Sequence, residues 1–173
     1  MSMKKSEGKP AKVIAVCGIL AALSVVILLL GALLGIGIYL APMIAGGSLL
    51  LVRRAYGVKY HVILWLAVSI LSLILVPSLE QNLMYLCLFG CYPIFYPYLQ
   101  KLGKGIRLVM KLFYFNAVFL AVELLLMLVL APEAIDSVFF VIFLLLGNAV
   151  FLCYDLALPR FGVLLNRRLG KYL

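Results

Sequence analysis

Glu123 is the ionisable side chain in this sequence most suited to chemistry inside an apolar segment. It is one of six acidic residues, and it lies within the apolar run 112–130. It stands about eight residues from the end of that run, which is roughly 12 Å along a helix. An ionisable group at such a depth in a membrane costs several kcal/mol unless it is paired, hydrogen-bonded or protonated. We therefore expect Glu123 to face the interior of a helix bundle.

Asn148 is the matching candidate in the last apolar run. Asn116 precedes Glu123 by seven residues, and Asp155 follows Asn148 by seven, so each run carries two polar residues on one helical face. If the two helices are antiparallel neighbours, Glu123 and Asn148 come to similar depths, which predicts a polar seam. Substrate binding and interhelical hydrogen bonding are both open interpretations of that pair. For Asn116 and Asp155 we favour interhelical contacts, or a salt bridge from Asp155 to Arg160.

A second polar group lies at the start of the apolar run 82–98. Glu80, Gln81 and Asn82 follow one another there. With the free N–H groups of a helix start they would form a small polar mouth, and a solvated loop is the alternative. Tyr39, at the start of an earlier apolar run, is the aromatic residue that we expect to line a pocket. These four residues, with Glu123 and Asn148, are the candidate substrate-binding residues.

No motif of a known catalytic machinery is present. The sequence has no glycine-rich phosphate loop, no His-Glu-x-x-His and no nucleophile elbow. His61, the one histidine, starts an apolar run, and we interpret it as an interfacial residue rather than a ligand. Cys87 and Cys91 share a helix face, but without a further His or Cys pair they indicate packing. We expect no catalytic residue, no metal site, no cofactor and no enzymatic activity.

The elements that must position these residues are long apolar runs. Of the 173 residues, 67% are hydrophobic and 12% are charged, whereas a soluble domain has roughly 25% charged residues. The mean hydropathy is +1.24. Because the runs are continuous rather than alternating, they predict helices and not barrel strands. We predict an all-α membrane protein, a compact bundle of about six transmembrane helices in a single domain, 1–173. The predicted spans are 13–34, 37–52, 60–76, 82–98, 112–130 and 137–158. The first two runs abut without a polar loop, so one bent segment is the alternative there.

The basic residues predict the orientation of this bundle. All 15 Lys and Arg residues fall in four segments: Lys4, Lys5, Lys9 and Lys12; Arg53, Arg54 and Lys59; Lys101, Lys104, Arg107 and Lys111; Arg160, Arg167, Arg168 and Lys171. The alternate loops contain none. The positive-inside rule therefore places both termini in the cytoplasm of a cell-membrane protein. The net charge of +9 does not indicate nucleic-acid binding, because no basic domain lies outside the apolar runs.

Two basic segments also carry apolar residues at helical spacing. They are 101–111 and the tail 160–173. Such amphipathic helices usually lie at the level of the lipid headgroups. We favour lipid anchoring for both, and docking of a partner protein is the alternative.

Small residues form a strip on the first predicted helix. Ala15, Gly18 and Ala22 lie at a spacing that allows close approach of another helix. Ala45, Gly46 and Gly47 do the same in the second. Packing within the chain and docking of a separate subunit are both open.

Several of these features together resemble a known family. A basic N-terminus leads into Cys17-Gly18-Ile19-Leu20-Ala21-Ala22-Leu23-Ser24, a short turn carries Ala41-Pro42, and Gly57 follows Arg53-Arg54. With six helices and both ends inside, this pattern resembles the S components of energy-coupling factor (ECF) transporters, the substrate-binding subunits of bacterial micronutrient importers. The likeness covers roughly residues 13–100.

The resemblance implies a function. It implies a six-helix protein that binds one small solute near its outer face and relies on a transmembrane coupling subunit and two ATPases for uptake. Ala15, Gly18 and Ala22 would then face the coupling subunit. The alternative is a non-transporting membrane scaffold of the cell envelope, although the Gly-Leu-x-x-Asp signature of cell-shape scaffold proteins is not found.

Overall fold

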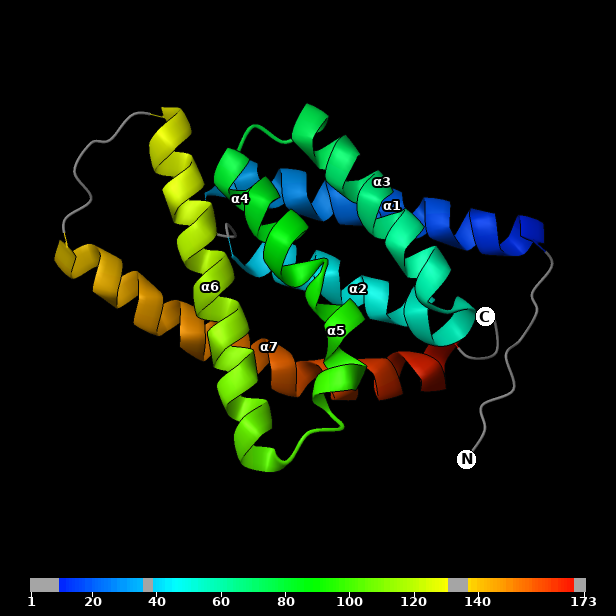
Figure 1. Ribbon diagram of the computed structural model, residues 1–173. Helices are drawn as coiled ribbons and strands as arrows, with labels where there is room; N and C mark the ends of the chain where they lie inside the picture. Colours follow the sequence, from blue (N-terminus) through cyan, green and yellow to red (C-terminus); the bar gives the residue numbers. More distant parts are fainter. Residues whose placement is uncertain (1–9, 36–38, 131–136, 170–173) are drawn as a thin grey trace.

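The computed structural model describes residues 10–35, 39–130 and 137–169, and all of its regular structure in these ranges is helical (Figure 1). The helices are α1 Pro10–Leu34, α2 Leu40–Tyr56, α3 Val58–Leu75, α4 Leu79–Leu83, the π-helix η1 Met84–Phe89, α5 Tyr92–Leu99, α6 Lys104–Leu130 and α7 Ser137–Leu169. Each predicted span therefore coincides with helical structure. The first two apolar runs form two separate helices, α1 and α2, rather than one bent segment.

Three of these helices are long and apolar enough to cross a membrane: Ala11–Leu34, Val58–Leu75 and Lys104–Leu128. Less than a third of each such window is buried inside the bundle. The apolar side chains that are not buried form a continuous surface larger than soluble proteins expose to water, so they require an apolar solvent. The chain is a membrane protein.

The predicted boundaries differ from the observed ones at both basic segments. Helix α6 begins at Lys104, so most of the segment 101–111 is the first part of a long helix and not a separate interfacial element. Helix α7 continues through Pro159 to Leu169, so the expected tail helix is continuous with the last span. In both cases a helix-breaking residue near the edge of the apolar run does not stop the helix, since Gly105 lies within α6 and Pro159 within α7.

Two clusters of buried side chains hold the bundle together. One joins α1, α2 and α3, and the other joins η1, α5, α6 and α7. Helix α2 contributes to both, since Leu49 belongs to the first cluster and Leu50 to the second. In Figure 1, α1 and α3 accordingly lie on one side of the molecule, and α6 and α7 on the other.

The segment α4–η1–α5 runs through the middle of the bundle (Figure 1). Glycine lets α2 approach it closely, because a Cβ at Gly46 would lie 2.4 Å from the carbonyl oxygen of Phe89. The π-helical geometry of η1 is a departure from regular α-helix that often occurs at functional sites. The sequence predicted one helix over 82–98, and the structure replaces it with three short pieces.

Side chains from the surrounding helices bind the backbone carbonyls of this broken segment. The donors are Trp65 Nε1 to Leu86 O at 3.0 Å, Tyr114 OH to Cys87 O at 2.8 Å, Tyr154 OH to Phe89 O at 3.3 Å, and Arg53 Nη1 to Pro93 O. A helix break inside a membrane protein persists only where such partners satisfy the freed backbone groups. The break is thus part of the packed core.

His61 belongs to the same set of contacts. Its side chain is fully buried, with Nδ1 at 3.1 Å from Leu49 O and Nε2 at 3.3 Å from Gly90 O. The prediction that His61 is an interfacial residue is therefore wrong, because the start of α3 packs against α2 and the central segment.

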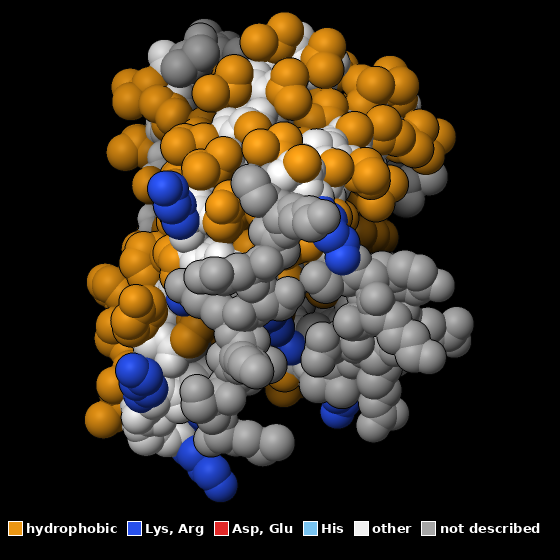
Figure 2. All heavy atoms as spheres, turned by 90° about the vertical axis from the view of Figure 1, so that its right-hand side faces the viewer, with side chains coloured by type: hydrophobic (Ala, Val, Ile, Leu, Met, Phe, Trp, Pro, Cys, Tyr) orange, Lys and Arg blue, Asp and Glu red, His pale blue; other side chains and the backbone are white. Residues whose placement is uncertain are grey.

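The two ends of the bundle differ in charge. Figure 2 views the end at which α1 begins and α2 ends, and several Lys and Arg side chains but no described Asp or Glu are visible there. We call this the basic end. At the opposite end, which we call the acidic end, lie Glu80 and Glu123, and the connection 76–78 between α3 and α4 has no Lys or Arg.

Candidate functional site

The best-formed candidate site is an apolar pocket of about 230 Å³ near the acidic end. It lies between the start of α2, the π-helix η1, α6 and α7. Its lining residues are Tyr39, Met84, Leu88, Phe89, Phe115, Phe119, Leu146, Gly147 and Val150. A cavity of about 150 Å³ with similar walls is enough to hold a benzene ring. The pocket can therefore accommodate a small apolar or aromatic group.

The pocket is open on one side. Leu146 and Val150 of α7 line it but are also exposed, at 57% and 36% of their surface. Gly147 of α7 lets the ring of Phe115 of α6 pack closely against α7, because a Cβ at position 147 would lie 2.7 Å from that ring. An apolar ligand could thus enter beside α7.

The polar edge of the pocket is a hydrogen bond between two of the predicted site residues. Tyr39 OH donates to Glu80 Oε1 at 2.8 Å. Tyr39 directly precedes α2, and Glu80 lies in the first turn of α4, where Ser78 Oγ accepts from the N–H of Gln81. Two turns that are 41 residues apart in sequence therefore meet at the pocket.

Glu123 lies near this pair. Its charge interacts with that of Glu80 and with Tyr39. It follows Phe119, a wall residue, by one helical turn, so both share a face of α6. Among the described residues no hydrogen bond or ion pair of Glu123 is found. Neither carboxylate lines the pocket itself, but Glu80 binds the lining residue Tyr39, and Glu123, which has no described hydrogen-bond or ion-pair partner, lies one turn beyond the lining residue Phe119.

Gln81 and Asn82, the other members of the predicted polar mouth, point into the bundle instead. Gln81 Nε2 donates to Leu28 O of α1 at 2.6 Å, and Asn82 Nδ2 donates to Val76 O at 3.0 Å. Both side chains are buried. They fix the turn between α3 and α4 against α1, and this role separates them from Glu80. Consecutive helical residues point in directions about 100° apart, so Glu80, Gln81 and Asn82 do not form one polar site.

Asn148 pairs with Asn116 and not with Glu123. The two amides exchange hydrogen bonds of 3.1 and 3.0 Å, and each Nδ2 also donates to a carbonyl in its own helix at 2.8 Å. The predicted seam between α6 and α7 exists, but its axial register differs from the expected one by seven residues. Asn148 adjoins the pocket residue Gly147, yet its amide is engaged between the helices.

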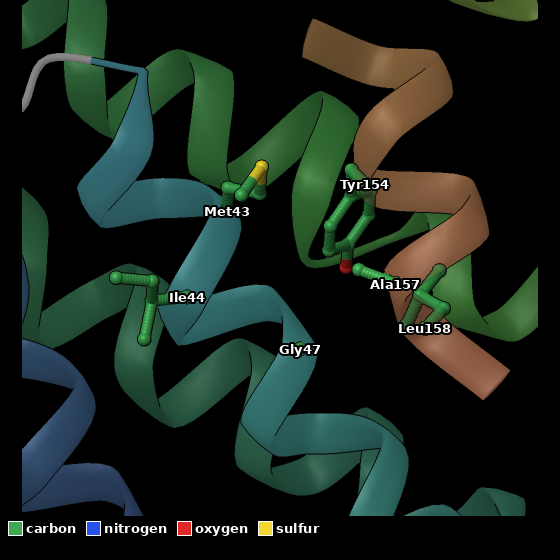
Figure 3. A pocket seen from close by; sticks show the side chains of 6 residues that line it. All are labelled: Met43, Ile44, Gly47, Tyr154, Ala157 and Leu158. Atoms are coloured by element: carbon green, nitrogen blue, oxygen red, sulfur yellow. The ribbon is translucent and has the colours of Figure 1, made fainter. Parts of the chain in front are cut away.

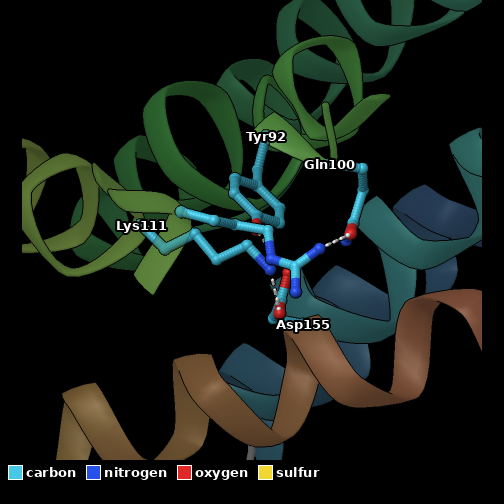
Figure 4. Close-up of polar contacts among 5 residues, drawn as sticks. Tyr92, Gln100, Lys111 and Asp155 are labelled. Carbon is cyan, nitrogen blue, oxygen red and sulfur yellow. Dashed lines mark hydrogen bonds and ion pairs between the residues drawn. The ribbon is translucent and has the colours of Figure 1, made fainter. Parts of the chain in front are cut away.

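Asp155 forms a second polar cluster at the basic end, shown in Figure 4. Its Oδ2 makes an ion pair with Lys111 Nζ, and its Oδ1 accepts a hydrogen bond of 2.5 Å from Tyr92 OH. Lys111 Nζ also lies 5.6 Å from the ring centre of Tyr96. The expected bond from Asp155 to Arg160 is replaced by this pair. The sequence did not signal it, because Lys111 was assigned to an interfacial segment.

A smaller apolar hollow lies between α2 and α7 (Figure 3). Met43, Ile44 and Gly47 line it from α2, and Tyr154 and Leu158 line it from α7. Its volume is about 60 Å³, which is roughly that of two water molecules in the liquid. This hollow is too small for a solute, and the one hydroxyl among its lining residues, that of Tyr154, already donates to Phe89 O.

The small-residue strip of α1 is open. Ala15, Gly18 and Ala22 are all exposed, and no atom lies within 4 Å of a Cβ placed at Gly18. Gly46 of α2, by contrast, is buried against the central segment. The two strips predicted from sequence thus differ: that of α2 serves packing within the chain, and that of α1 does not.

The fold and these clusters define a helical membrane protein with a pocket between four of its helices. No protein-family model, curated protein or solved structure matches the chain.

Proposed function

We propose that this protein is a solute-binding membrane subunit of the ECF type, with both termini in the cytoplasm, whose ligand is a small amphipathic cation. The ligand's apolar body would occupy the pocket between α2, η1, α6 and α7. Its positive group would lie beside Glu80 and Glu123 at the outer face. Uptake would depend on a separate coupling subunit with ATPases.

The observation that carries the proposal is that two carboxylates lie next to lining residues of a pocket with aromatic walls: Glu80 binds Tyr39, and Glu123 lies one helical turn beyond Phe119. Tyr39 connects the pocket to Glu80, because it lines the pocket and its hydroxyl donates to the Glu80 carboxylate. Glu123 has no described ion-pair partner, and no Lys or Arg occurs in the sequence segments 35–40, 76–80 or 123–136. A bound cation would offset the repulsion between the carboxylates, and aromatic faces add cation–π attraction of about 0.5–2 kcal/mol.

The exposed strip on α1 supports the partner part of the proposal. A helix of another subunit can approach Ala15, Gly18 and Ala22 closely, and such small-residue contacts drive helix association in membranes. This is the face that the ECF resemblance assigns to the coupling subunit.

Ligand binding can be tested with the purified protein in nanodiscs. Thermal shift would be measured against a panel of aromatic and alkyl amines, each paired with a neutral analogue of the same shape. We expect stabilisation by at least one amine and little by its neutral analogue. Glu123→Gln should remove this preference while the variant still inserts and folds.

A cavity-filling variant provides the matched control. Val150→Trp places a large side chain in the pocket, whereas Leu120→Trp places it on an exposed position of α6. The first should abolish the shift and the second should preserve it. If no amine stabilises the protein, or if neutral analogues stabilise it equally, the proposed ligand class is wrong.

Co-purification tests the partner. A tagged chain expressed in its native host should recover a coupling subunit and ATPases, and Gly18→Leu should lose them while retaining ligand binding. Recovery of envelope-assembly proteins without ATPases, combined with no ligand binding, would instead establish the membrane scaffold as the function.

A further inference from the structure

A second pocket, of about 340 Å³, lies between α6 and α7 at the basic end. It is lined by Lys104, Arg107, Leu108, Lys111, Leu152, Asp155 and Leu156. The four residues from α6 are spaced by three and four positions and therefore lie on one face of that helix. The three from α7 follow the same spacing. The pocket is thus the space between two facing helix surfaces.

The charges in this pocket are unequal. Three cations, those of Lys104, Arg107 and Lys111, accompany one carboxylate, that of Asp155. Both oxygens of that carboxylate are occupied by Lys111 and Tyr92. With Asp155 paired to Lys111, the cations of Lys104 and Arg107 leave the pocket with a net positive charge.

Arg107 is held in place for binding an anion. Its Nη1 donates to Gln100 Oε1 at 2.7 Å, which fixes the guanidinium and leaves its remaining N–H groups available. Lys104 is exposed and is the first residue of α6. The start of a helix carries a partial positive charge, which adds to the attraction for an anion.

The other wall of the pocket is apolar and continues onto the surface of the bundle. Leu108 and Leu156 line the pocket, and 48% and 65% of their respective surfaces are exposed. Lys104 and Lys111 are seven residues apart, so the polar part of the pocket extends about 10 Å along α6. Lys104 and Arg107 precede the exposed Leu108 along α6, an order that matches headgroup and acyl chain in a lipid leaflet.

We propose that this pocket binds an anionic phospholipid of the cytoplasmic leaflet. The phosphate group would lie between Lys104 and Arg107, and the first part of an acyl chain would lie along Leu108, Leu152 and Leu156. Basic pockets between transmembrane helices on the cytoplasmic side bind such headgroups in other membrane proteins. The bound lipid would join the start of α6 to the middle of α7, near the point where Lys111 and Asp155 already connect the two helices.

Lipid titration of the full chain with native mass spectrometry tests this site. The detergent-solubilised protein would be titrated with phosphatidylglycerol and, separately, with phosphatidylcholine of the same chains. We expect phosphatidylglycerol to bind more tightly. The variant Lys104→Gln/Arg107→Gln should weaken it about 30-fold, at about 1 kcal/mol for each lost cation.

The matched control removes two exposed cations that lie on α1 and α3 and do not line the pocket, Lys12→Gln/Lys59→Gln. At about 0.15 M ionic strength charges beyond roughly 8 Å are screened, so the control should keep nearly all of its affinity. Lys104→Gln alone, at an exposed position, gives a partial loss in case the double variant does not fold.

Three results would overturn the proposal. Equal binding of the two lipids would show that the pocket does not distinguish an anionic headgroup from a zwitterionic one. Equal loss in the control variant would show that only the overall charge of this end matters. Saturation by glycerol phosphate with the same affinity as the lipid would assign the pocket to a free phosphate compound.

Discussion

The ion pair between Lys111 and Asp155 allows a quantitative test of how this bundle is held together. The two side chains are only 6% and 10% exposed. Replacement of Asp155 by Leu leaves the Lys111 ammonium with the ring of Tyr96 as its remaining described partner. Replacement of Lys111 by Met leaves the Asp155 carboxylate with the single hydroxyl of Tyr92.

Each single replacement should destabilise the protein by about 3–5 kcal/mol, because it leaves an uncompensated buried charge. The double variant Lys111→Met/Asp155→Leu removes both charges, and such replacements are often neutral or stabilising. The hydroxyl of Tyr92 then lacks its acceptor, which costs about 1–3 kcal/mol. We therefore expect the double variant to lose at most about 3 kcal/mol, far less than the sum of the single effects.

The free energy of unfolding would be measured by reversible SDS titration in mixed micelles, with circular dichroism and Trp65 fluorescence as two probes. Adding Tyr92→Phe to the double variant should restore stability, because it removes the unpaired hydroxyl. Lys59→Met, at an exposed position, is the control and should change stability by less than about 0.5 kcal/mol. Additive single effects, with a double variant as unstable as their sum, would refute the reasoning.

Two further predictions concern the helix contacts. Gly46→Ala should destabilise the bundle by about 1–3 kcal/mol in the same SDS titration, because the new Cβ would lie 2.4 Å from a backbone oxygen of η1. Gly18→Ala, where nothing lies within 4 Å of the new Cβ, should be neutral. Asn116→Ala and Asn148→Ala should each cost about 1–2 kcal/mol by leaving the partner amide unpaired. The double variant should cost clearly less than the sum of the two, and strict additivity would contradict the reciprocal pair seen here.

The sequence by itself determined the helical elements and the class of protein. Continuous apolar runs in a medium without water admit only helices or barrels, and the positions of the runs set the helices to within a few residues at most ends. The sequence also identified Tyr39, Glu80 and Glu123 as candidates, since a tyrosine at a helix start and carboxylates within or beside apolar runs are unusual enough to be noticed.

Tertiary structure decided which of these residues meet. The period of a helix fixes which residues share a face, but it does not fix how far one helix slides along its neighbour. For that reason the polar faces of α6 and α7 were recognised, whereas the pairing of Asn148 with Asn116 and of Asp155 with Lys111 was not. The register depends on side-chain packing across the whole interface and on the turns at its ends.

The break in the central segment also depends on tertiary structure. Gly90 and Pro93 are local signals of a break in the run 82–98, and Pro93 lies in the first turn of α5. The groups that offset the cost of the break, however, lie far away in sequence. Trp65, Tyr114 and Tyr154 supply the hydrogen bonds from three other helices. The broken segment has its hydrogen-bond partners only when those helices are assembled around it. The pocket that the segment lines also forms only in the assembled bundle.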